Sequence, residues 1–192
     1  MCGRFANSET IPAMRAHFAA EGTEIAWTAS WNITPTRNIP VLIQDLRSRR
    51  LGLMRWGWNP AALGGRLLIN CRGEEAHQKR LFTETLIHRR CLVPATLFYE
   101  WQPATVPKAR PQPFAFADTR SSLFAIAGLW SNRVATDGAR IGEVILMTVP
   151  ANQGRIDRSL GYYQSGFFSS MGLRSRPRDC RTFLKAAHRF SV

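Results

Sequence analysis

The segment PFAFADTRSSLFAIAGLWSNRVATDGARIGEVILMTV (113–149) decides the fold class of this chain. It contains three apolar runs rich in Phe, Ile and Val, namely PFAFAD (113–118), SLFAIAGLW (122–130) and EVILMTV (143–149). Runs of this length and composition are typical of β-strands. We therefore expect a sheet built around this segment.

Outward from this segment, the chain continues with further strands and a few helices. We expect a loop and then a strand within 31–44, strands over 50–58, 66–70 and 91–101, and helices over 9–20 and 73–90. The 192 residues are enough for one domain with a sizeable core, whereas two domains would be crowded. The prediction is a single α+β domain, rich in β-structure, with short helices around a central, mostly antiparallel sheet.

The sequence changes character near its C-terminal end. Residues 153–192 contain eight Lys or Arg against two Asp, a net charge of +6, and they lose the alternation expected of strands. We therefore assign residues 1–152 to the domain and treat 153–192 as an atypical basic segment. A reading-frame shift or truncation near residue 153 is the hypothesis for its origin.

The overall charge indicates the class of partner. Lys and Arg exceed Asp and Glu by 26 to 13, and such an excess favours polyanions, with nucleic acid first. Six Trp among many Arg could stack on unpaired bases. The chain has no apolar run long enough to cross a bilayer and no signal-peptide pattern, so we expect a cytoplasmic protein without a membrane partner.

The four cysteines point to one unusual residue. None lies at zinc-ligand spacing, so we expect no metal and no cofactor. Cys2 stands apart because removal of Met1 would give it a free α-amine beside its thiol. Such a 1,2-aminothiol can condense with an aldehyde and close a thiazolidine ring, helped by proximity. Arg4 is expected to help ionise the thiol. Taken alone, a cysteine at position 2 is better explained as an accident of the start codon.

Ordered motifs favour the chemical interpretation of Cys2. MCGRF at the N-terminus and RRCLVPATLFYEW (89–101) resemble motifs of the SRAP family, whose members process abasic sites in DNA. Further segments that resemble the family's motifs, in the family's order, are WNITPTRNIPVL (31–42), MRWGWNP (54–60), INCRGEE (69–75), LFAIAGLW (123–130) and ILMTVPAN (145–152). Together they span about residues 1–152, and an ordered series is far more specific than any single motif.

The resemblance implies a function and a set of reactive residues. It implies capture of abasic sites in single-stranded DNA as a covalent thiazolidine on Cys2, as part of the DNA damage response and near the nucleoid. Asn70 would position the N-terminus, unless it only closes a turn at a strand end. Glu100, expected to be partly buried with a raised pKa, would move protons, unless it only forms a buried salt bridge with Arg89 or Arg90.

The resemblance also implies DNA contacts. Arg4 and Arg72 would hold phosphates beside the lesion, or else be ordinary surface arginines in ion pairs. The remaining residues expected around the DNA, with the two tryptophans either stacking on a base or lying in the core, are Pro35, Thr36, Trp56 and Trp58.

One family residue has no counterpart here. The family carries a histidine shortly after its "AN" motif, whereas this chain reads RIDRSLGYYQSGFF (155–168) at that place. No role passes to the histidines that are present, His17, His77, His88 and His188. Without this group we expect cross-linking to be slower rather than absent, by about 10²–10⁴-fold for a general acid.

Two other functions compete with the cross-linking enzyme. A thiol autopeptidase, as the family's older name implies, would need residues ahead of Cys2 to remove, and here only Met1 precedes it. A non-catalytic or impaired single-strand binding remnant would keep the electrostatics and lose the chemistry. We expect a monomer that acts on single-stranded DNA containing abasic sites, of the lyase or peptidase class.

Overall fold

The computed structural model describes residues 2–44, 48–60, 63–102, 104, 106–119, 121–150, 158–160 and 162–163. Its strands are β1 (Phe5–Asn7), β2 (Ser30–Ile33), β3 (Asn38–Gln44), β4 (Arg49–Trp56), β5 (Asn70–Arg72), β6 (Arg90–Ala95), β7 (Leu97–Gln102), β8 (Gln112–Phe116), β9 (Phe124–Val134), β10 (Arg140–Pro150), β11 (Arg158–Leu160) and β12 (Tyr162–Tyr163). Its helices are α1 (Ile11–Phe18), α2 (Gly73–Ala76) and α3 (Arg80–His88).

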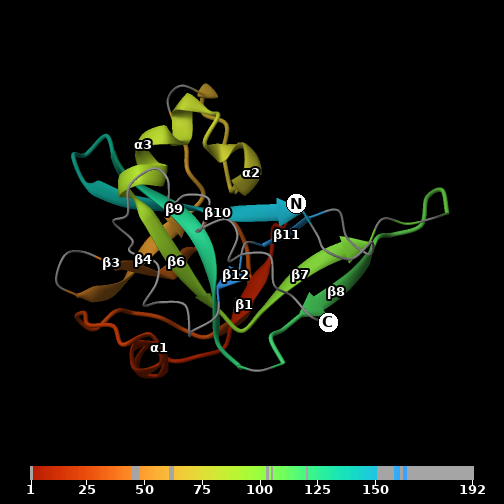
Figure 1. The fold of residues 1–192 in the computed structure, drawn as a ribbon, viewed down its shortest axis with the longest axis horizontal. Coiled ribbons are helices and arrows are strands. Elements are labelled where there is room, and N and C mark those ends of the chain that lie inside the picture. Colours follow the sequence, from red (N-terminus) through yellow and green to blue (C-terminus); the bar gives the residue numbers. More distant parts are fainter. Residues whose placement is uncertain are drawn as a thin grey trace.

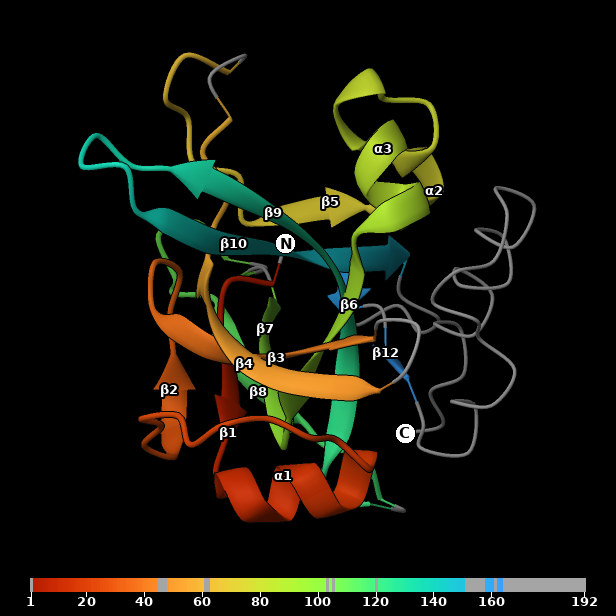
Figure 2. The same cartoon turned by 90° about the vertical axis from the view of Figure 1, so that its left-hand side faces the viewer.

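The larger sheet closes on itself. Strands β10, β4, β3, β6 and β9 are paired in that order, and β9 pairs back onto β10. The pairings along this circuit are antiparallel except the one between β10 and β4, which is parallel. Strand β5 adds to β10 in parallel, and β11 and β12 add to β10 and β9. Figures 1 and 2 show these strands curving around a common centre. The predicted α+β class is confirmed.

A second sheet brings the N-terminus against the middle of the chain. Its four strands follow the order β2-β1-β7-β8, so β1 lies between β2 and β7. Phe5 pairs with Ile33 on one side and with Phe98 on the other. Strands β7 and β8 form a hairpin that projects from the body of the molecule (Figure 1). This sheet places Cys2, just ahead of β1, beside the strand that carries Glu100.

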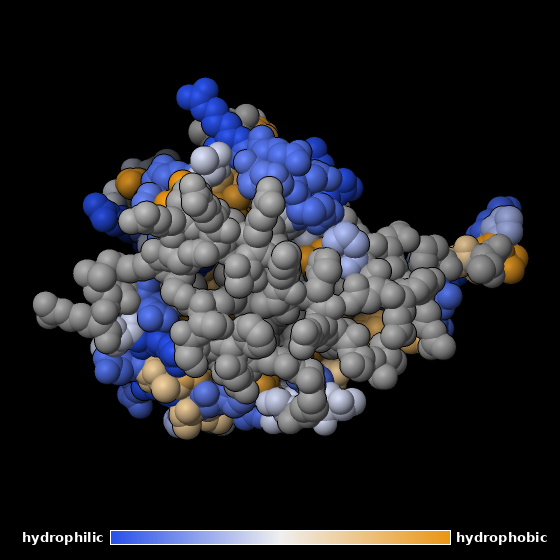
Figure 3. Space-filling view, in the orientation of Figure 1, coloured by the Kyte–Doolittle hydropathy of each residue, from blue (hydrophilic) through white to orange (hydrophobic). Residues whose placement is uncertain are grey.

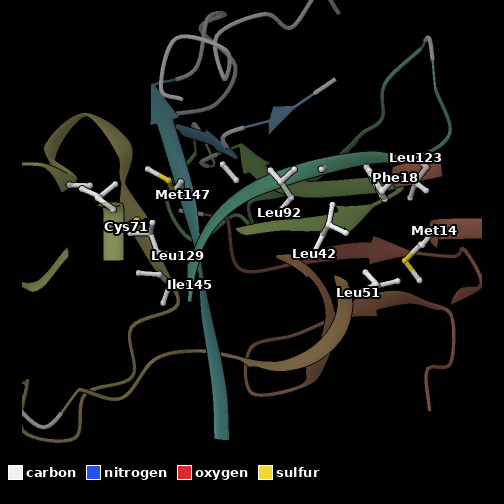
Figure 4. Packing of buried hydrophobic residues seen from close by; sticks show 14 of the residues in the cluster. Met14, Phe18, Leu42, Leu51, Cys71, Leu92, Leu123, Leu129, Ile145 and Met147 are labelled. Carbon is white, nitrogen blue, oxygen red and sulfur yellow. The ribbon is translucent and has the colours of Figure 1, made fainter. Parts of the chain in front are cut away.

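Two groups of buried side chains hold the sheets and helices together. One includes Met14 and Phe18 of α1 together with Leu42, Leu92 and Ile145 of the larger sheet (Figure 4). The other surrounds Phe5, Trp56 and Phe98 where the two sheets meet. Burial of such side chains contributes roughly 1.5–3 kcal/mol each, so the junction between the sheets is well fixed.

Several predicted elements differ from the structure at their boundaries. The single helix expected over 73–90 is two helices, because the backbone N–H groups of Gln78 and Lys79 bond three residues back and tighten the turn. The strand expected over 91–101 is two strands separated at Thr96, with Pro94 inside β6. The strand expected over 66–70 begins only at Asn70, after an isolated bridge between Trp58 and Leu68.

The C-terminal segment is described only in part. Arg158–Leu160 pair with Thr148–Pro150 of β10, and Tyr162–Tyr163 pair with β9. The rest of 153–192, and therefore most of the hypothesis of a frame shift or truncation, lies outside the described residues. None of the helices in the described part of the chain has the length and apolar character that crossing a membrane would need.

Candidate active site

Cys2 lies in the core where the two sheets meet. Its residue is fully buried, and its Sγ is 3.3 Å from the carbonyl oxygens of both Arg4 and Tyr99. The thiol can therefore donate a hydrogen bond to the backbone on either side of the β1–β7 pair. These contacts hold the sulfur at a fixed place, three residues before the first residue of an equally buried strand.

Asn70 contacts the backbone of Cys2 directly. Its Nδ2 donates a hydrogen bond of 2.5 Å to the Cys2 carbonyl oxygen, across 68 residues of sequence. The side chain is held in place because β5 is paired with Leu146–Thr148 of β10. Its Oδ1 is buried and accepts no hydrogen bond from the described residues. Beside Cys2, Asn70 thus has a donor, Nδ2, that bonds the Cys2 carbonyl, and an acceptor, Oδ1, that no donor among the described residues reaches.

Glu100 completes a buried group around the thiol. It lies on β7, next to the strand that Cys2 leads into, and is 5% exposed. Its carboxylate hydrogen-bonds the Cys2 thiol and adds negative charge next to it. The predicted burial of Glu100 is confirmed, and its neighbour along the chain, Trp101, points to solvent because successive strand residues alternate between faces. We call Cys2, Asn70 and Glu100 the reaction centre.

The protonation of Cys2 differs from what the sequence suggested. Burial, followed by the charge of Glu100, raises the pKa of the Cys2 thiol from 9.0 to about 12. Arg4 lowers that pKa only through a backbone hydrogen bond and not through the charge of its guanidinium, so the expectation that it would ionise the sulfur is wrong. Desolvation of a thiolate outweighs the help of a single backbone contact. At neutral pH the thiol is protonated.

Arg4 instead occupies the surface side of the smaller sheet. Its Nη1 donates a hydrogen bond of 2.8 Å to Asn32 Oδ1, and its guanidinium carbon lies 6.0 Å from the ring centroid of Trp101. Arg4 thus links β2 to β7 across the start of β1. A guanidinium in this place is available to a phosphate two residues from Cys2.

Arg72 lies close to Asn70 in sequence but at the surface. Its side chain is half-exposed, and its Nη1 is 2.8 Å from Glu75 Oε1, while Lys79 Nζ is 2.8 Å from the other oxygen of the same carboxylate. Because two cations hydrogen-bond it, the pKa of Glu75 falls from 4.5 to about 2. We call Arg72, Glu75 and Lys79 the arginine corner. Hydrophilic residues gather over this α2–α3 part of the surface in Figure 3.

The remaining predicted residues divide between loop and core. Pro35 and Thr36 form the turn after β2, where Thr36 is exposed with a φ of 76° and its N–H bonds the Trp56 carbonyl at 2.7 Å. Trp56 is fully buried against Phe5, and its Nε1 donates to Ile69, so it offers no ring surface to a base. For this residue the structure supports the core alternative.

Trp58 occupies an intermediate place. It is half-buried and packs against the core beside Phe82, with ring centroids 6.1 Å apart. Two exposed tryptophans are absent from the predicted DNA contacts, namely Trp31 at 63% and Trp101 at 38%. Strand alternation around the buried Glu100 could have identified Trp101. The outward position of Trp31 depends on a bulge that no sequence signal marks.

The histidines in the described residues do not supply an obvious substitute for the family's histidine. His17 is on α1 and packs against Phe18, His77 is the C-cap that follows α2, and His88 is the last residue of α3. His188 and most of 155–168 lie outside the described residues. Within the ranges described here, no three His, Cys, Asp or Glu side chains are arranged to hold a metal ion.

The chain is similar in sequence to proteins of one known family. Residues 1–157 match the sequence model of the family described as SOS response associated peptidase (SRAP). The chain is 31% identical over 159 residues to the abasic site processing protein YoqW of Bacillus subtilis (strain 168), covering 80% of this chain and 70% of YoqW. It is 27% identical over 169 residues to the abasic site processing protein YedK of Escherichia coli (strain K12), covering 82% and 71%.

A solved structure supports the fold. A crystal structure of a protein from Bacteroides thetaiotaomicron superposes with a TM-score of 0.83 at 16% identity, covering 95% of this chain and 86% of that one. A second, from Bordetella bronchiseptica, gives a TM-score of 0.74 at 22% identity, with 95% and 93% covered. At these identities the likeness concerns the fold alone.

Proposed function

The chain belongs to the SOS response associated peptidase (SRAP) family, and on that premise we propose that it captures abasic sites in single-stranded DNA through Cys2. The observation that carries the proposal is the reaction centre. A buried Cys2 whose carbonyl is held by Asn70 at 2.5 Å and whose thiol meets Glu100 has the groups that aldehyde capture needs. Relatives named abasic site processing proteins support the choice of aldehyde.

The first step uses the α-amine that removal of Met1 would expose. This amine attacks the C1′ aldehyde of the ring-opened deoxyribose, and loss of one water leaves an imine between the Cys2 nitrogen and C1′. An α-amine titrates near ~8, so a useful fraction is neutral at pH 7. The open Oδ1 of Asn70 is suited to accept an N–H of that amine, while its Nδ2 keeps the Cys2 carbonyl in place.

The second step closes the ring. The thiol sulfur forms a bond to the imine carbon as its proton leaves, and the imine nitrogen gains a proton, so the thiazolidine forms without further loss of atoms. Because the pKa of the thiol is raised to about 12, a base must take its proton during the attack. Glu100 is the carboxylate in contact with it. Ring closure within one residue then benefits from proximity.

The surroundings of Cys2 suit a single strand rather than a duplex. Arg4 and Arg72 are suited to contact phosphates, and the exposed Trp101 offers a ring to an unpaired base. A net charge of +13 favours a polyanion at long range. We propose that the chain acts as a monomer in the cytoplasm, on the nucleoid when DNA is bound, and as a lyase-type rather than a proteolytic enzyme.

The test is a cross-linking assay on a denaturing gel. Purified protein, with loss of Met1 verified by mass spectrometry, is mixed with single-stranded DNA that contains one abasic site. We expect a shifted band that is absent with Cys2→Ala and with DNA carrying a tetrahydrofuran residue, which has no aldehyde. Equal bands from wild type and Cys2→Ala, or none from either, would contradict the proposal. Binding on native gels alone would favour a non-catalytic single-strand binding protein.

A further inference from the structure

The geometry points to Trp31 as a stacking residue for the base that flanks the captured lesion. This inference rests on the proposed function, because it assigns the nucleobase next to the abasic site as the occupant of the Trp31 surface. Among the large apolar side chains that the structure describes, Trp31 is one of the most exposed, at 63%. An indole left this open usually serves an interaction.

A bulge in β2 turns this residue outward. Phe5 pairs with Ile33 and Asn7 with Ser30, so two residues of β2 lie opposite the single residue Ala6 of β1. Trp31 and Asn32 occupy the extra space, and both are exposed, whereas Ile33 is buried at 3%. Bulges next to active sites commonly change the direction of a side chain. Here the bulge lies beside the strand that Cys2 precedes.

The backbone of Trp31 is fixed although its ring is open. The Tyr99 hydroxyl donates a hydrogen bond of 2.8 Å to the Trp31 carbonyl oxygen. Tyr99 is also the residue whose own carbonyl lies 3.3 Å from Cys2 Sγ. One β7 residue therefore contacts both the Cys2 sulfur and the backbone of Trp31. A ring carried on a fixed backbone leaves less to be ordered when a ligand stacks on it.

The residues around Trp31 favour a nucleic acid strand as the ligand of this surface. Asn32 accepts the hydrogen bond from Arg4, and the Arg4 guanidinium lies 6.0 Å from the Trp101 ring centroid. Two exposed indoles thus belong to strands on opposite sides of the strand that follows Arg4. A cation that lies beside one exposed indole and bonds the neighbour of the other fits a phosphate next to stacked bases.

The spacing of the β-strands fits single-stranded DNA that lacks one base. Strands β2 and β7 are separated by β1, which places them roughly 10 Å apart at about 4.8 Å per strand. The two bases that flank an abasic nucleotide are at least two steps of about 3.4 Å apart, and more in an extended single strand. Trp31 would take one flanking base, and Trp101 lies where the other would pass.

The experiment tests whether the contribution of Trp31 to DNA affinity depends on the bases that flank the lesion. Affinity is measured by fluorescence anisotropy for single-stranded DNA with one tetrahydrofuran residue, which cannot cross-link, and for DNA with tetrahydrofuran also at both flanking positions. The variants are Trp31→Leu, which keeps apolar area but removes the ring, and Trp31→Phe, which keeps a ring. Val134→Ala, a change at a residue 65% exposed on the β9–β10 hairpin, is the control.

We expect Trp31→Leu to raise Kd by about 5- to 100-fold on DNA with flanking bases, as stacking contributes ~1–3 kcal/mol per base. Trp31→Phe recovers most of the affinity, and Val134→Ala binds like wild type. On DNA without flanking bases the Trp31→Leu effect falls below about twofold. Wild-type affinity of Trp31→Leu, or an equal loss on both DNAs, would overturn the inference, the second pointing to another partner or to misfolding.

Failure of this inference can be separated from failure of the proposed function. With a true abasic site at saturating protein, the Cys2-dependent band reports the chemistry whatever Trp31 does. If that band forms and Trp31→Leu binds DNA like wild type, the stacking role is wrong and the function stands. If no Cys2-dependent band forms while the affinity loss still requires flanking bases, the stacking role stands on a protein that only binds DNA.

Discussion

The reaction centre and the arginine corner each have one residue on strand β5, two positions apart, and the two groups differ in burial. Asn70 is 6% exposed and meets Cys2, whereas Arg72, on the same strand β5, is half-exposed and meets Glu75. A carboxylate takes part in each group, Glu100 inside and Glu75 outside. This difference indicates that burial, more than residue type, determines how much free energy a single contact contributes here.

The largest effect is expected from a substitution that breaks the contact at the buried end of β5. Asn70→Ala removes the hydrogen bond to the Cys2 carbonyl and leaves that oxygen without the Asn70 donor, at a cost of ~1–3 kcal/mol. If the contact positions the N-terminus, cross-linking slows by about 10- to 100-fold, with the rate read from quenched time points on denaturing gels. The saturating rate constant should carry the loss, because DNA binding uses other residues.

Asn132→Ala is the matched control for this change, since Asn132 is exposed on β9. It should react like wild type and unfold at the same temperature. A rate within about twofold of wild type for a folded Asn70→Ala would show that Asn70 only closes the strand end, as the alternative interpretation of its position held.

The next largest effect is on the pH dependence of stability, through the protonation of the Cys2 thiol. In the folded protein the thiol has a pKa of about 12 against 9.0 for an exposed thiol, so the folded state holds its proton more tightly. The stability from this difference is fully present below pH 9 and is lost as pH rises toward 12, by up to ~1.4 kcal/mol per pH unit. Cys71 behaves in the same way, and burial also raises the pKa of Cys91.

Urea unfolding of wild type and Cys2→Ala at pH 8 and pH 10 checks this. The free energy of unfolding should fall more steeply with pH for wild type, since the variant lacks one of the buried thiols. Parallel pH dependences for the two proteins would show that Cys2 is solvated in the folded state. Glu100→Gln should lower the pKa of the thiol but keep it above 9.0, because burial is the larger cause.

The same comparison explains how far the sequence could lead. Apolar runs rich in Phe, Ile and Val were sufficient to predict β9 and β10, which are buried over most of their lengths. The aromatic neighbours of Glu100 at a strand end were sufficient to predict its burial. The contact between Asn70 and Cys2 spans 68 residues, so only the resemblance to a family could suggest it. Nothing in local pattern specifies such a long-range hydrogen bond.

Tertiary context determined what the sequence could not show. The sequence left Trp56 open between core and stacking, and the structure buries it because two sheets meet at its ring. The expected ionisation of Cys2 by Arg4 was wrong because charge was weighed without desolvation. The exposure of Trp31 depends on pairing between β1 and β2, which a single strand's sequence does not contain.

A smaller effect is expected at the exposed end of β5. Arg72→Ala should weaken binding to single-stranded DNA severalfold at low salt and reduce the slope of log K against log salt concentration by about 0.7, the value for one phosphate contact. Arg140→Ala, a change at an exposed arginine at the start of β10, is the control. An unchanged slope for Arg72→Ala would mean that its pair with Glu75 is structural.

The smallest effect concerns Glu75 itself. Its carboxylate neutralises part of Arg72 and Lys79, so Glu75→Gln should tighten single-stranded DNA binding by about two- to threefold at low salt, and less at 0.5 M salt because surface charges are screened. Glu84→Gln, whose side chain is 76% exposed and 3.9 Å from Arg89, is the matched control.

The stability of Glu75→Gln tests the same point through pH. The lowered pKa of Glu75, about 2, means that its ion pairs add stability at neutral pH, which is lost as pH falls from 4.5 through 2. Because the group is at the surface, wild type and Glu75→Gln should have nearly equal urea midpoints at pH 7, and any difference should vanish near pH 2. A large difference at pH 7 would place the arginine corner with the reaction centre, as a site where one contact carries stability.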